Sequence, residues 1–218
     1  MANKGQIGVT TENIFPVIKQ FLYSDHEIFL RELVANAVED LEIRLAYDRG
    51  ARTVTVSDNG IGMTADEMED NLGTIAHSGS EEFKAANGDA QGSEVDIIGQ
   101  FGVGFYSAFM VAKKVTIESL SWKEGAEAVL WSCEGDPEFE MGPAEKDGRG
   151  TVVTLFLDED SAKDYGNKGK ISQLLGKYCK FMPVPIVFGK EQEWKIINSI
   201  EPLWTRKPSD LKDEDYVK

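Results

Sequence analysis

The sequence predicts a domain of mixed α-helices and β-strands, followed by a short polar tail. Amphipathic helical stretches come first, and strand-like runs follow them along most of the chain. The 218 residues are 41% hydrophobic and 28% charged, which is typical of a soluble globular protein able to bury a sizeable core. We therefore expect one large domain, or one domain and a tail.

Two helices are expected near the N-terminus and one further on. Apolar residues recur at helical spacing between Thr11 and Tyr23. Ser24-Asp25-His26-Glu27 has the pattern of a capping box, which would start the second helix. Thr64-Ala65-Asp66-Glu67 is another such pattern and predicts a short helix ending near Leu72.

Strands are expected over much of the remaining chain. Residues 42–48 and 52–57 are predicted to pair around the turn Arg49-Gly50-Ala51. Further strands are expected at 115–120, 128–132, 151–157 and 184–188, with helices at 106–111 and 171–181. Residues 73–99 hold many Gly and Ser and few large apolar side chains, which indicates a surface loop or lid.

Two joins lack the usual signals that end an element. The second helix runs past Asn36 into the strand at Glu42 without a stop signal. The stretch Trp194-Lys195-Ile196-Ile197 is similarly abrupt. We interpret both joins as places where segments are missing from the sequence.

The overall charge limits the kinds of partner. The net charge is −15, from 38 acidic and 23 basic residues, which argues against nucleic acid. Any phosphate ligand would need local backbone amides, a helix N-terminus or a metal ion. Cys133 and Cys179 form no CxxC pair and there are two histidines, so structural zinc is not expected. With no signal-like or membrane-spanning stretch, we expect a cytoplasmic protein in a reducing compartment.

The motif Asp58-Asn59-Gly60-Ile61-Gly62-Met63 follows the strand-like run 52–57. Side chains two apart on a strand share a face, so Asp58 continues the apolar face of Val54 and Val56. A carboxylate facing a core needs donors, and the glycines would let backbone approach a ligand closely. The motif indicates a site for a donor-bearing ring; the alternative is an ordinary hairpin turn.

Glu32 and Asn36 are four residues apart on the second helix and lie on one of its faces. An amide oxygen suits Mg²⁺, and a carboxylate can accept a proton from water. The alternative is two polar residues on a helix shoulder. Gly99-Gln100-Phe101-Gly102-Val103-Gly104 is a glycine-rich turn that would hold phosphate or act as a hinge. It is not the dinucleotide fingerprint, and no GxxxxGK[ST] occurs.

Several residues around these motifs have ordinary structural alternatives. Asn71 and Thr74 would cap a helix end, and Gly150-Thr151 would form a simple turn. Met63, Leu72, Phe101 and Phe105 would line an apolar slot for a flat ring or pack in the core.

Five runs together resemble the amino-terminal ATP-binding domain of the heat-shock protein 90 chaperones, and the sequence around Cys179 to Phe188 most resembles the bacterial members. The five runs are YSDHEIFLREL at 23–33, NA at 36–37, DNGIGM at 58–63, NLGTIA at 71–76 and IGQFGVGFYSA at 98–108. The likeness extends over nearly the whole chain. Single motifs are shared with type II topoisomerases, mismatch-repair ATPases and histidine kinases.

The resemblance implies a two-layer sandwich: a mixed, largely antiparallel sheet covered on one face by helices, with an ATP lid at about 73–100. It implies that Asp58 accepts the adenine amino group and that Glu32 activates the hydrolytic water. It implies that Asn36 binds Mg²⁺. The further residues it implies for ATP binding are Gly62, Met63, Asn71, Leu72, Gly102, Val103, Gly104, Phe105 and Thr151.

The resemblance also implies a domain plan and partners. Residues 1–207 would form the ATP-binding domain, and 208–218 would begin a linker to a middle domain. Client proteins and the middle and C-terminal domains would be partners. The full-length protein would be a homodimer, and this chain alone a slow, monomeric ATPase with no nucleic-acid or membrane partner. The family usually has Lys at His77 and Asp at Glu39, and it extends the helix beyond that point.

Two other functions stay open at this point. One is a regulatory nucleotide-binding module that does not hydrolyse ATP. The other is a different enzyme of the same superfamily, such as a histidine kinase, against which the chaperone-specific runs 71–76 and 98–108 count.

Overall fold

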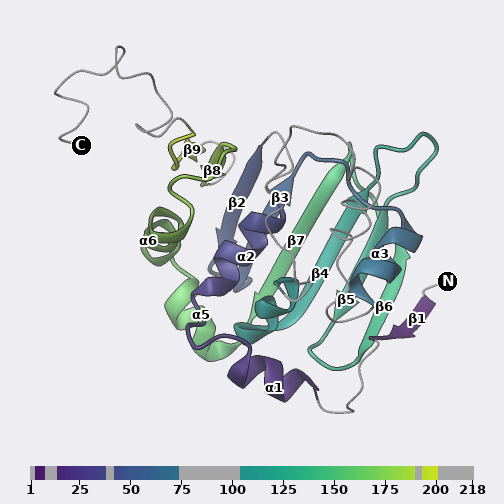
Figure 1. The fold of residues 1–218 in the computed structure, drawn as a ribbon, viewed down its shortest axis with the longest axis horizontal. Coiled ribbons are helices and arrows are strands. Elements are labelled where there is room, and N and C mark those ends of the chain that lie inside the picture. The colour runs from purple at the N-terminus through teal and green to yellow at the C-terminus, as the bar shows by residue number, and fades with distance from the viewer. Residues whose placement is uncertain (1–2, 8–13, 38–41, 74–103, 190–192, 201–218) are drawn as a thin grey trace, which may run out of the picture.

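The computed structural model describes residues 3–7, 14–37, 42–73, 104–189 and 193–200 (Figure 1). Several sequence predictions lie outside these ranges. They are the lid beyond Gly73, the glycine-rich turn before Gly104, the join at 38–41 and the tail at 208–218.

A nine-stranded sheet forms one layer of the described fold, in the order β1-β6-β5-β4-β7-β3-β2-β8-β9. Only β2 and β8 pair in parallel; the other neighbours are antiparallel. The strands are β1 Asn3–Gln6, β2 Ile43–Asp48, β3 Thr53–Asp58, β4 Ala112–Leu120, β5 Val129–Cys133, β6 Glu138–Pro143, β7 Gly150–Leu157, β8 Ile186–Phe188 and β9 Lys195–Ile196.

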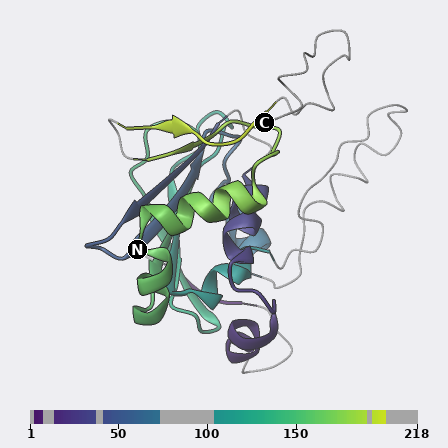
Figure 2. The ribbon, with the colours of Figure 1, turned by 90° about the vertical axis from the view of Figure 1, so that its left-hand side faces the viewer.

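Helices form the second layer. They are α1 Ile14–Phe21, α2 Ile28–Asn36, α3 Ala65–Leu72, the 3₁₀ helix η1 Phe105–Met110, α5 Glu159–Tyr165 and α6 Lys168–Tyr178. Figures 1 and 2 show α1, α2 and α3 on one face of the sheet, with α6 at the side of β2 and β8. The predicted fold class, a two-layer sandwich with a mixed and largely antiparallel sheet, is confirmed.

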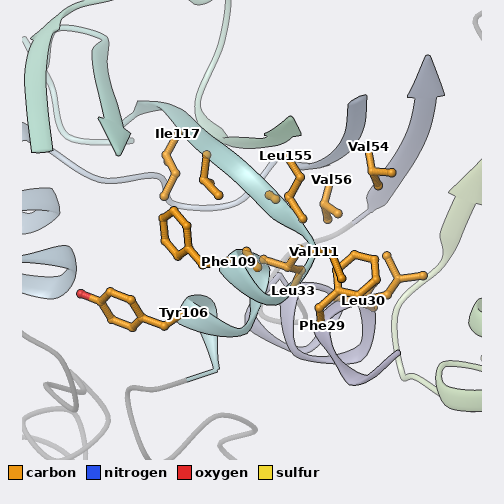
Figure 3. Packing of buried hydrophobic residues seen from close by; sticks show 14 of the residues in the cluster. Phe29, Leu30, Leu33, Val54, Val56, Tyr106, Phe109, Val111, Ile117 and Leu155 are labelled. Carbon is orange, nitrogen blue, oxygen red and sulfur yellow. The ribbon is translucent and has the colours of Figure 1, made fainter. Parts of the chain in front are cut away.

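The core lies between the two layers, as Figure 3 shows. Phe29 and Leu33 of α2 are buried against the inward side chains of the sheet, among them Val56 of β3 and Leu155 of β7. Phe109 of η1 packs in the same cluster. Burial of such side chains stabilises a fold by about 1.5–3 kcal/mol each, so this layer contact fixes where α2 sits on the sheet.

The two predicted capping boxes have different outcomes. Thr64 caps α3 as predicted: its side chain accepts the Glu67 N–H, and the Glu67 carboxylate accepts the Thr64 N–H at 2.8 Å. The box at Ser24 is wrong, because α2 begins only at Ile28 and has no side-chain cap. Glu27 is instead bound by Lys170 and Lys177 of α6.

Other elements differ in detail from the predictions. The hairpin of β2 and β3 is confirmed, with Ile43 opposite Asp58. The expected helix at 106–111 is a 3₁₀ helix, in which Ser107 donates its hydroxyl to the Gly104 carbonyl at 2.6 Å. Strands β1, β6 and β9 and helix α5 were not predicted. No helix in the described ranges is both long and apolar enough to span a bilayer.

Candidate functional site

Asp58 ends β3 on the face that the helices cover. Val54 and Val56, at the same parity, are buried, and Asp58 itself is partly exposed. Its Oδ1 accepts the backbone N–H of Thr151 at 2.8 Å and of Gly60 at 3.1 Å. Within the described residues, Oδ2 accepts no hydrogen bond. The carboxylate is therefore fixed by one oxygen, and the other has unused capacity to accept.

The turn after Asp58 is held tightly against the end of β4. Ile61 accepts the N–H of Trp122 at 2.7 Å, and Met63 donates its N–H to the Ser119 hydroxyl at 2.8 Å. Gly62 has φ +61°, and a Cβ there would lie 2.0 Å from the Leu120 carbonyl oxygen. Only glycine fits both this backbone conformation and this contact.

Gly150 and Thr151, at the start of β7, complete the surroundings of Asp58. Gly150 has φ +111°, and a Cβ there would lie 2.3 Å from the Asp58 carbonyl oxygen. This close approach brings the Thr151 N–H to the Asp58 carboxylate. The Thr151 hydroxyl lies 3.0 Å from the Ser119 hydroxyl. The structure thus brings Thr151 beside the motif that contains Asp58 and Met63, although Thr151 lies 93 residues beyond Asp58 in the sequence.

Glu32 lies on α2 with only 13% of its side chain exposed. Its Oε1 accepts from Arg31 Nη1 at 3.0 Å. A Cβ on Gly104 would lie 2.6 Å from Glu32 Oε2, so the carboxylate rests against the backbone that begins η1. Asn36, the last residue of α2, is exposed. These residues form a second cluster, made by helices and not by the sheet.

Two of the apolar residues predicted to line a slot for a flat ring, Leu72 and Phe105, lie at the end of α3 and the start of η1. Leu72 is buried, and its carbonyl accepts the Tyr106 hydroxyl at 2.9 Å. Phe105 is partly buried, and its ring centroid is 5.6 Å from that of Trp131. Asn71 is partly buried beside Leu72. The bond from Tyr106 to Leu72 therefore links η1, whose first residue is Phe105, to the end of α3.

Some predicted residues lie outside the described ranges. These are Glu39, Thr74, His77, Phe101, Gly102 and Val103. Ser119 was missed in the sequence, although it is fully buried and bonds two segments of the site. Its only sequence signal is a hydroxyl on the inward parity of a predicted strand, shared with Val115 and Ile117.

A cleft of about 260 Å³ lies elsewhere, over β5 and β6. Both of its lysines form ion pairs, Lys4 with Glu140 at 2.7 Å and Lys114 with Glu134 at 3.4 Å, and Asp136 and Glu138 add further negative charge to its lining. Buried Cys133 also lines it, and burial raises the pKa of that thiol. None of the residues predicted to bind ATP lines this cleft, so it gives no support to a nucleotide site there.

The position of α2 depends on a cluster of charges at its start. Glu27 accepts hydrogen bonds from Lys170, and from Lys177 at 2.9 Å. These bonds lower the pKa of the Glu27 carboxyl to about 2 and raise the pKa of Lys177. Tyr178 donates to Asp25 at 2.8 Å. Side-chain charges on α6 thus hold the beginning of the helix that carries Glu32.

The fold is consistent with a known class of ATPases. The chain belongs to the family described as histidine kinase-, DNA gyrase B-, and HSP90-like ATPases, whose pattern matches residues 23–133.

Bacterial proteins that match this sequence over nearly all of its length show which members of the family it resembles. The chain is 49% identical to the chaperone protein HtpG of Porphyromonas gingivalis strain W83 and 50% identical to that of Bacteroides fragilis strain YCH46, in each case over 99% of this chain and 35% of the relative. It is 39% identical to the HtpG of Actinobacillus succinogenes, over 98% of this chain and 39% of that protein. The resemblance to the heat-shock protein 90 family is confirmed. The chain spans little more than a third of the length of these relatives.

Proposed function

We propose that this chain is an ATP-binding, slowly ATP-hydrolysing domain of a molecular chaperone. The observation that carries the proposal is the Asp58 carboxylate, which two backbone N–H groups fix by Oδ1, while Oδ2 accepts no hydrogen bond from the residues that the structure describes. A fixed acceptor on the helix-covered face suits the amino group of adenine. The family and the names of the bacterial relatives agree with this assignment.

At the base end, Asp58 takes the adenine amino group, and Gly62 and Thr151 act through water. Met63, Leu72 and Phe105 pack near the ring, and Asn71 contacts the ribose and phosphate region. The short chain of hydrogen bonds from Asp58 through Thr151 and Ser119 to Met63 supports this grouping.

At the phosphate end, Glu32 acts as general base for the attacking water. The Asn36 amide oxygen would hold Mg²⁺, which would supply neutralisation of the charge on the phosphates. Within the described ranges, no three His, Cys, Asp or Glu side chains form a metal site. An ion that takes most of its ligands from nucleotide and water needs no such cluster, so the residues fit this role.

The remaining assignments come from the family and not from the described geometry. Gly102, Val103 and Gly104 give amides to the phosphates, and the lid at about 73–100 closes over them. Residues 1–207 form the domain, and 208–218 begin a linker. His77 and Glu39 replace the usual Lys and Asp, so one cationic contact depends on pH.

The partners are proposed for the longer protein of which this domain is a part. They are client proteins, its middle and C-terminal domains, and a second copy in a homodimer; this chain alone is a monomer, with no nucleic-acid or membrane partner. A cytoplasmic location agrees with the two free, buried cysteines.

Titration calorimetry with ATP tests the proposal. We expect binding by the chain, and a loss of affinity of about 10- to 150-fold in Asp58→Asn, because a charged acceptor is replaced by a donor that faces a donor. Asp147→Asn is the matched control, since Asp147 is an exposed loop carboxylate. Undiminished affinity in Asp58→Asn would refute the assigned role of Asp58.

A regulatory module that binds ATP without hydrolysis is the second candidate. It is favoured by the ion pair that engages Glu32 Oε1 with Arg31 Nη1 at 3.0 Å, since an engaged carboxylate is less free to take a proton. Phosphate release under single-turnover conditions separates the two functions, with ADP release measured with and without Mg²⁺.

A further inference from the structure

Ser119 is a buried hydroxyl on the apolar side of β4. It shares its parity with Val115 and Ile117, and all three are buried. A hydroxyl in such a position is stable only when it is hydrogen bonded. Its partners are the Met63 N–H at 2.8 Å, the Thr151 hydroxyl at 3.0 Å and the Gly150 carbonyl at 3.3 Å. All of them belong to the segments around Asp58.

The number of hydrogens decides the direction of these bonds. The Met63 N–H can only donate and the Gly150 carbonyl can only accept, and Ser119 has a single hydroxyl hydrogen. All three bonds form together only if Ser119 donates to Gly150 and Thr151 donates to Ser119. If Ser119 donated to Thr151 instead, the bond to Gly150 would be lost. The complete arrangement leaves only lone pairs on Thr151 Oγ1.

We propose that Ser119 is a specificity-determining residue: it fixes the Thr151 hydroxyl as an acceptor, so that the base end selects a purine with an amino group over one with an oxo group. This inference rests on the proposed function. Thr151 also gives its N–H to Asp58 Oδ1 at 2.8 Å, so the two acceptors are neighbours. Two adjacent acceptors can accept hydrogen bonds from an amino group or from a water molecule bound to it. They disfavour a carbonyl oxygen, which has no hydrogen to donate.

Ser119 acts through Thr151 and is a positioning residue. Without the Ser119 hydroxyl, the Thr151 hydroxyl can turn its hydrogen toward the ligand. Thr151 Oγ1 is then no longer fixed as an acceptor and can also act as a donor to the base. We therefore expect loss of the Ser119 hydroxyl to change which base the site prefers and not to change the reaction at the phosphate. The matched comparison is ATP with ITP, which carries an oxo group where adenine has its amino group.

The test measures the ratio of the dissociation constants of ITP and ATP by calorimetry on the 218-residue chain. We expect Ser119→Ala to lower this ratio by about five- to tenfold, which corresponds to the loss of one neutral hydrogen bond. Ser121→Ala is the control, because Ser121, directly after the end of β4, is also buried, but its hydroxyl accepts the nearby Lys123 N–H, at 3.4 Å, and within the described residues contacts no segment around Asp58 by a hydrogen bond. We expect it to leave the ratio unchanged.

Variants of Thr151 keep the test decisive if Ser119→Ala does not fold. Thr151→Val removes the hydroxyl and keeps the N–H that bonds Asp58, so it should lower the ratio similarly. Thr151→Ser keeps the hydroxyl and should retain the ratio. In a double-mutant cycle, Ser119→Ala should add nothing to Thr151→Val.

The outcomes separate this inference from the proposed function. A wild-type chain that binds no ATP overturns the proposed function and, with it, the inference. ATP and ITP binding equally well would also overturn the inference, since no selection would exist. A folded Ser119→Ala or Thr151→Val that keeps the wild-type ratio overturns the inference alone.

Discussion

The two ends of the candidate site are built differently. At the base end, Asp58 belongs to the central sheet, and backbone groups of Gly60 and Thr151 hold its carboxylate. At the proposed phosphate end, Glu32 belongs to a helix: Arg31 donates to its carboxylate, and Lys170 and Lys177 of α6 bind Glu27 at the start of that helix. One end depends on backbone geometry and the other on side chains.

The two glycine contacts show this difference directly. At Gly62 an added Cβ would meet the Leu120 backbone, which cannot move without disturbing β4. At Gly104 it would meet the end of the Glu32 side chain, which can rotate away. We infer that the backbone around Asp58, the proposed base end, is rigid, whereas the position of the Glu32 carboxylate, the proposed general base, is adjustable. A lower local stability at a moving part is common in enzymes.

Glu32→Ala gives the largest expected effect. A general base contributes about 10²–10⁴ to the rate, so turnover should fall by that factor while the dissociation constant of ATP stays the same. Phosphate release and calorimetry measure the two quantities. Glu124→Ala, which removes an exposed loop carboxylate, is the control. An unchanged rate in Glu32→Ala would exclude Glu32 as the base.

Gly62→Ala should be strongly destabilising. Its φ of +61° and its contact with the Leu120 carbonyl together predict a loss of roughly 2–5 kcal/mol in unfolding free energy. Gly125→Ala is the matched control, because Gly125 has φ +79° but no atom within 4 Å of an added Cβ. It should lose only about 1–2 kcal/mol. If urea denaturation gave the same loss of unfolding free energy for both variants, the contact with Leu120 would contribute nothing to the effect of Gly62→Ala.

The base end was the more predictable from sequence. The parity of Asp58 with Val54 and Val56 placed it on the covered face, and the structure has it there. Thr64 as a cap was also predictable, since the capping box involves only neighbouring residues. Such local patterns are visible in a sequence because their partners are a few residues away.

The missed features depend on distant partners. Glu27 was predicted to complete a capping box, but Lys170 and Lys177, more than 140 residues away, bind it instead. Ser119 looks like any strand serine until Met63 and Thr151 are beside it. Strand β6 was missed because it buries only Phe139 and Met141, and α5 because Tyr165 is its only buried residue.

Gly104→Ala tests whether the phosphate end is adjustable. Gly104 has φ −58°, which alanine adopts without strain, so little stability should be lost. The new methyl group would displace the Glu32 carboxylate from its place 2.6 Å away. We expect turnover to fall on the order of tenfold, because small displacements of a catalytic group slow the reaction. A stability loss as large as that of Gly62→Ala, measured by the same urea denaturation, would contradict the comparison.

Glu27→Gln gives the smallest effect and tests the charges that hold α2. Binding by Lys170 and Lys177 lowers the pKa of Glu27 to about 2 from an ordinary value of 4.5. A lowered pKa stabilises the fold above pH 4.5, and this stabilisation is lost as the pH falls toward 2. With the side chain 22% exposed, we expect wild type to exceed Glu27→Gln by about 0.5–1 kcal/mol near pH 7, and the difference to shrink below pH 4.5. Glu134→Gln, which alters an exposed pair at 3.4 Å, should show no such pH dependence in urea denaturation. A Glu27→Gln difference that does not change with pH would show that packing, and not the charge, holds the start of α2.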